Sequence, residues 1–169
     1  MAKVTQIVLR MARKLTDDIA VLGRLRAAGR PKTFPRFREI RSAYLDIQGL
    51  IFSIQERLEE AGNELPSNFP QWVLRQKLTA IAMFTDISHA FVSDPPIALT
   101  SSLGAFDVLE AEQKAFNETL HTFDTMLLEA GIDDKTADEL DATRSKIEQI
   151  LGMIETLLVR SPKILKEFE

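Results

Sequence analysis

The sequence of 169 residues contains no cysteine. Disulfide bonds, thiolate nucleophiles and cysteine-based zinc sites are therefore excluded, and the composition fits a reducing compartment. No apolar run approaches the ~18 residues that a transmembrane helix needs. The first residues, MAKVTQIVLRMARKL, are basic and amphipathic but lack the compact apolar stretch of a secretory signal. We therefore expect a cytoplasmic protein whose N-terminus forms an ordinary helix.

Histidine is almost as scarce, since the chain has only His89 and His121. Each follows an acid by three residues, as Asp86-x-x-His89 and Glu118-x-x-His121, so acid and imidazole share one face of a helix. In these two short motifs the chain resembles ferritin-like di-iron bundles, where such pairs help to bind metal. The resemblance implies a metal-dependent helical-bundle enzyme, which we keep as a second alternative.

The apolar pattern argues against that metal site. Over residues 105–130, Glu118 and His121 point away from the core stripe that contains Phe116 and Phe123. The two motifs also lie on consecutive segments, whereas di-iron bundles alternate them with helices that supply a single Glu. The sequence also lacks a glycine-rich phosphate loop and a G-x-S-x-G elbow. We therefore expect no catalytic residues, no metal and no cofactor.

Apolar residues recur at helical spacing along the chain, and no segment alternates as a strand would. Glycine and proline divide this pattern into pieces. The piece around Phe84 is apolar nearly all round, which predicts a central helix. The sequence thus predicts one all-α domain over residues 1–169, an antiparallel up-down bundle with sequential packing and a short C-terminal helical tail, SPKILKEFE. Its five long helices are expected at residues 3–28, 36–61, 70–93, 105–130 and 134–160.

Two of the expected helix starts share one local pattern, TFPRF at 33–37 and NFPQW at 68–72. Each has a polar capping candidate, then Phe-Pro, then a second aromatic residue. Proline suits the first turn of a helix because its missing N–H would have no partner there. Asn68 and Gln71 have capping-box spacing, and each aromatic pair is expected to staple the incoming chain to its helix.

A second apolar strip follows the helix predicted over 36–61 and consists of Leu45, Gly49 and Phe52. Glycine inside a helix costs about 1 kcal/mol relative to alanine. Its place between two apolar residues suggests a close approach of another backbone. Two interpretations stay open: packing against another helix of the same bundle, or an interface with a second copy or a partner. Gly152 also lies inside a predicted helix, and the same two interpretations apply to it.

Charge is unevenly distributed along the chain, although the formal net charge is only −4. Residues 1–41 contain eleven basic and three acidic side chains, which gives +8. The remaining 128 residues contain ten basic and 22 acidic side chains, which gives −12. In a bundle, the basic first helix could therefore face acidic later helices and be neutralised within one molecule.

Part of the basic charge collects at the turn before the second helix. Basic residues in the first turns of a helix oppose its dipole, so folding alone does not favour them there. An anion would relieve this conflict, and the interleaved Phe34 and Phe37 would allow bases of a single strand to stack. The residues expected to bind an anion or a partner are Arg30, Lys32, Arg36, Arg38 and Arg41.

The sequence therefore predicts a non-enzymatic protein-interaction module, such as a small adaptor, subunit or scaffold. It would act through the five basic residues given above, Arg30, Lys32, Arg36, Arg38 and Arg41, which we call the basic corner, and through the apolar strip of Leu45, Gly49 and Phe52. The expected partner is an acidic protein surface or a second copy of the chain. The alternative is a nucleic-acid-binding helical protein that uses region 24–41.

Overall fold

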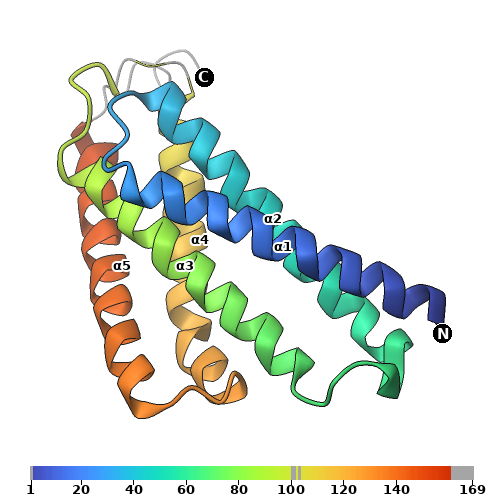
Figure 1. The fold of residues 1–169 in the computed structure, drawn as a ribbon. Helices are drawn as coiled ribbons and strands as arrows, with labels where there is room; N and C mark the ends of the chain where they lie inside the picture. The colour runs from blue at the N-terminus through green and yellow to red at the C-terminus, as the bar shows by residue number, and fades with distance from the viewer. Residues whose placement is uncertain (1, 100–101, 103, 161–169) are drawn as a thin grey trace, which may run out of the picture.

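The computed structural model describes residues 2–99, 102 and 104–160 and contains five long helices, as predicted (Figure 1). Their bounds differ from those expected by one or two residues at most. The predicted C-terminal helical tail lies outside the described residues. The long helices are α1 (Ala2–Ala27), α2 (Phe34–Ala61), α3 (Phe69–Ser93), α4 (Ala105–Glu129) and α5 (Asp134–Arg160), and a short 3-10 turn, η1 (Gly62–Glu64), follows α2.

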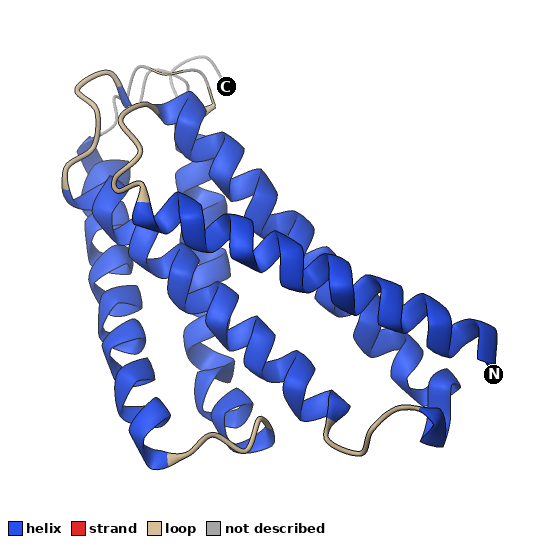
Figure 2. Ribbon diagram, viewed as in Figure 1, coloured by secondary structure: helices blue, strands red, loops and turns tan. Residues whose placement is uncertain are grey.

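Consecutive long helices run in opposite directions, so the fold is the expected antiparallel helical bundle (Figure 1). Secondary structure among the described residues is helical, with loops and no strand (Figure 2). The α1–α2 pair and the α4–α5 pair lie together at one end of the molecule and diverge toward the other, with α3 between them (Figure 1). None of the helices in the described part of the chain is long and apolar enough to cross a bilayer.

Helix α3 is the centre of the bundle, as its nearly continuous apolar surface predicts. It packs against α1, α2 and α5, and residues all round its circumference are buried, among them Val73, Leu78, Phe84 and Phe91. The prediction of sequential packing is wrong at one step, since α3 packs mainly against α5 and only slightly against α4. A helix that is apolar on every side can accept any neighbour, so sequence order does not fix which one it receives.

The two helices with proline in the first turn, α2 and α3, are capped differently at their N-termini. Thr33 caps α2, because its hydroxyl oxygen accepts a hydrogen bond from the backbone N–H of Arg36 at 3.2 Å. The capping box predicted at Asn68 is not formed, because the Asn68 side chain makes no capping hydrogen bond. The aromatic staple is present at α3, where the Phe69 and Trp72 rings stack with centroids 5.4 Å apart.

Candidate interaction surface

The apolar strip of α2 lies on the outside of the molecule. The Leu45 side chain is 45% exposed and that of Phe52 is 61% exposed, and a side chain placed on Gly49 would meet no atom within 4 Å. Packing of this strip against another helix of the same bundle was one of the two interpretations of the sequence. It is wrong, because no other described segment covers the strip.

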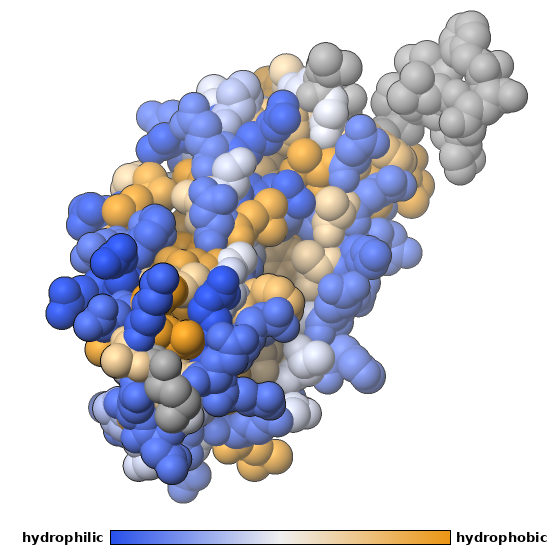
Figure 3. Space-filling model, turned by 90° about the vertical axis from the view of Figure 1, so that its right-hand side faces the viewer, coloured by the Kyte–Doolittle hydropathy of each residue, from blue (hydrophilic) through white to orange (hydrophobic). Residues whose placement is uncertain are grey.

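The register of α2 explains why the strip faces outward. Its buried stripe contains Ile40, Ile47, Ile51 and Ile54 and packs toward α1 and α3. The strip is rotated from that stripe, so no helix in the described part of the bundle covers it. Seen from the right-hand side of Figure 1, the molecular surface shows hydrophobic patches between hydrophilic residues (Figure 3).

The basic corner lies at the turn between α1 and α2 and at the start of α2. A pocket of about 290 Å³ opens there, lined by Arg30, Lys32, Thr33 and Arg36 among others. Lys32, Arg36 and Arg38 are exposed. Arg36 pairs with Glu39 of the same helix turn at 2.8 Å, and the Arg38 guanidinium lies 5.7 Å from the centroid of the Phe34 ring. These side chains present positive charge to solvent.

Two predicted corner residues instead form contacts with acids far away in the sequence. Arg30 donates to the backbone carbonyl of Asp94 and pairs with its carboxylate. Arg41 pairs with Glu112 of α4, whose side chain is only 5% exposed. The basic corner is therefore partly neutralised within the molecule, and its solvent-facing part consists mainly of Lys32, Arg36 and Arg38.

The Arg41–Glu112 pair links α2 to α4 at the edge of the core. Burial raises the pKa of the Glu112 carboxyl, and the hydrogen bond from Arg41 opposes this shift. Tyr44 lies one turn further along α2, and burial together with the charge of Glu112 raises the pKa of its phenol. The Tyr44 ring stacks on Phe84 of α3 with centroids 4.1 Å apart. Sequence reasoning missed Glu112, although an acid at a core position of the α4 register was a signal for it.

The aromatic residues of the corner are part of the same core. Phe34 is 5% exposed and Phe37 is 1% exposed, and Phe37 stacks on Phe91 with ring centroids 4.3 Å apart. The expectation that they could stack with nucleic-acid bases is wrong, because their faces are covered by protein. What is left for a nucleic acid at this corner is phosphate contact, which carries no sequence information directly.

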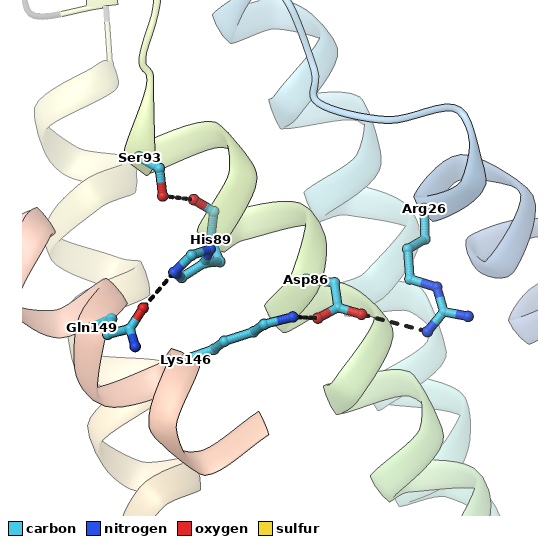
Figure 4. Close-up of polar contacts among 6 residues, drawn as sticks. All are labelled: Arg26, Asp86, His89, Ser93, Lys146 and Gln149. Carbon is cyan, nitrogen blue, oxygen red and sulfur yellow. Dashed lines mark hydrogen bonds and ion pairs between the residues drawn. The ribbon is translucent and has the colours of Figure 1, made fainter. Parts of the chain in front are cut away.

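The two acid–histidine motifs lie in different surroundings. Asp86 forms an ion pair with Lys146 of α5 at 2.7 Å and a longer one with Arg26 of α1 at 3.5 Å. His89 is hydrogen-bonded to Gln149 of α5 at 2.7 Å (Figure 4). These contacts connect α3 to α1 and α5.

Glu118 and His121 of the second motif are exposed on α4. Within residues 2–99, 102 and 104–160, no group of three or more histidine or acidic side chains is placed to hold a metal ion. The structure therefore does not bring the two motifs together.

Comparison with protein-family models, with curated proteins and with solved structures found no match for this chain.

Proposed function

We propose that this protein is a non-enzymatic interaction module, a small adaptor, subunit or scaffold, that binds another protein through the outer face of α2. The observation that carries the proposal is the exposure of Leu45 and Phe52 on one helix face, on either side of the open Gly49. Burial of a large apolar side chain contributes about 1.5–3 kcal/mol. Exposed aromatic residues are also frequent anchors of protein interfaces.

The charges on the same helix support a protein partner. Arg36 and Arg38 stand at the beginning of α2, on the solvent side, where they would guide an acidic surface toward the apolar strip. Nucleic acid is the less favoured ligand, because Phe34 and Phe37 are buried and offer no stacking face.

A photoreactive phenylalanine analogue at position 52 tests the proposal in cells. We expect it to form a protein adduct of defined mass, because Phe52 would be covered by the partner. The matched control carries the analogue at Leu128 of α4, which is 84% exposed but outside the proposed surface. The same pattern of adducts from both positions would contradict the proposal.

Charge reversal at the corner tests its contribution. The variant Arg36→Glu/Arg38→Glu removes bases that oppose the α2 dipole but also loses the Arg36–Glu39 pair and the Arg38–Phe34 contact. Because these effects have opposite signs, its free energy of unfolding should change by no more than about 1 kcal/mol. The yield of the adduct formed from position 52 should decrease. Titration of single-stranded and duplex DNA at two salt concentrations completes the test. Salt-dependent binding that the double substitution abolishes, without any adduct at position 52, would favour the nucleic-acid alternative.

A further inference from the structure

The outer face of α2 carries a regular seam that extends beyond the apolar strip. Its residues alternate at spacings of four and three, which is the pattern of a seam between two paired helices. All of them are exposed, so this seam is separate from the buried stripe by which α2 packs into its own bundle. The seam consists of Arg38, Ser42, Leu45, Gly49, Phe52, Glu56 and Glu59.

The seam is basic at one end, apolar in the middle and acidic at the other. Arg38 precedes Gly49 by eleven residues, and Glu59 follows it by ten. Leu45 precedes Gly49 by four residues, and Phe52 follows it by three. The pattern is therefore close to symmetric about Gly49 in position and opposite in charge. A surface of this kind is complementary to itself when a second copy is turned end for end.

We infer that the partner of this face is a second copy of the chain, with the two α2 helices antiparallel and crossing at Gly49 about a two-fold axis. This inference rests on the proposed function. Leu45 then lies against Phe52 of the partner subunit, and Arg38 lies beside Glu59 of the partner subunit. A parallel arrangement would place like charges together at both ends.

Gly49 suits the crossing point. The open space above its Cα lets a second backbone approach closely. Among the described residues, neither Arg38 nor Glu59 forms an ion pair, so each can pair across the axis. A seam of one helix per copy is small beside the ~1,200–2,000 Å² of a standard interface. The dimer should therefore be reversible, and high salt should weaken it.

Sedimentation equilibrium of the full chain, from micromolar to millimolar concentration, tests the inference. We expect reversible dimerisation that Phe52→Glu abolishes while the circular dichroism and melting of the monomer stay unchanged. Leu128→Glu is the matched control and should dimerise like the wild type. A wild-type chain that stays monomeric at every concentration would overturn the inference.

A charge swap tests the antiparallel orientation. Arg38→Glu and Glu59→Arg should each weaken the dimer by about tenfold, because each substitution alters two symmetric contacts. The double variant Arg38→Glu/Glu59→Arg should restore it, since the pairs are then re-formed with opposite sign. Glu110→Arg, on exposed α4 surface, is the control. Failure of the double variant to recover would contradict this arrangement.

The position-52 photo-crosslink on purified protein separates the possible failures. The antiparallel seam predicts an adduct of twice the chain mass, with the crosslinked residue located by fragmentation at or beside Leu45 of the partner subunit. Mapping to Phe52 of the partner subunit would indicate a parallel pair and overturn the inference. A monomeric purified protein that still forms a position-52 adduct with another protein in cells would end this inference alone. Absence of adducts in both settings would end the proposed function as well.

Discussion

The two sides of α2 use the same residue types for opposite purposes. On the inner side, Arg41 is paired with the buried Glu112, and Tyr44 stacks on Phe84. On the outer side, Arg38 and Phe52 face solvent. An arginine and an aromatic residue are therefore structural on one face of this helix and available to a partner on the other. The difference between these arginines and aromatic residues arises from the angular position of each one around the helix.

The largest expected effect comes from breaking the inner pair. Arg41→Met leaves the Glu112 carboxylate buried without its cation, which should lower the free energy of unfolding by about 3 kcal/mol. Arg38→Met, the matched change on the outer face, should cost no more than about 1 kcal/mol, the value of an exposed cation–π contact. Urea unfolding followed by circular dichroism measures both.

The double variant Arg41→Met/Glu112→Leu sharpens this prediction. Removal of both charges should recover most of the lost stability, because apolar replacements of a buried pair are often neutral or better. Equal losses in Arg41→Met and Arg38→Met would show that the two faces do not differ in this way.

The pH dependence of Arg41→Met should identify Glu112 as the cause. Since burial raises the pKa of Glu112, ionisation of this group costs stability. That cost is absent below the carboxyl's unfolded pKa and develops as the pH rises through its folded pKa. Without Arg41 the cost is larger, so the stability gap between wild type and variant should shrink from neutral pH to about pH 4.5. A gap that stays constant over this range would assign the loss to packing instead.

The smallest expected effect separates folding from association at the two exposed helical glycines. A side chain on Gly49 or on Gly152 would meet no atom within 4 Å. Alanine at either position should therefore raise the free energy of unfolding of the monomer by about 0.5–1 kcal/mol. The larger Gly49→Gln should also fold well but prevent self-association, whereas Gly152→Gln should leave association unchanged. Loss of monomer stability in Gly49→Ala would show that the α2 backbone needs a glycine for its own packing.

The sequence by itself determined the helices, because apolar spacing and the glycine and proline breaks act locally. It placed all five within two residues at each end. It also indicated the apolar strip at Leu45, Gly49 and Phe52, since these residues are offset from the core stripe in the primary structure, but it left open what the strip packs against. The central place of α3 followed from its apolar circumference in the same way.

Only the tertiary structure decided which charges are structural and which are available. Arg41 and Glu112 are 71 residues apart, and their pairing depends on how α2 and α4 are placed around the bundle, which helical periodicity does not encode. The same packing buries Phe34 and Phe37 and sets α3 against α5 rather than α4. Spacing along one helix fixes the direction of each side chain relative to that helix. The identity of what it meets is fixed by the arrangement of helices around it.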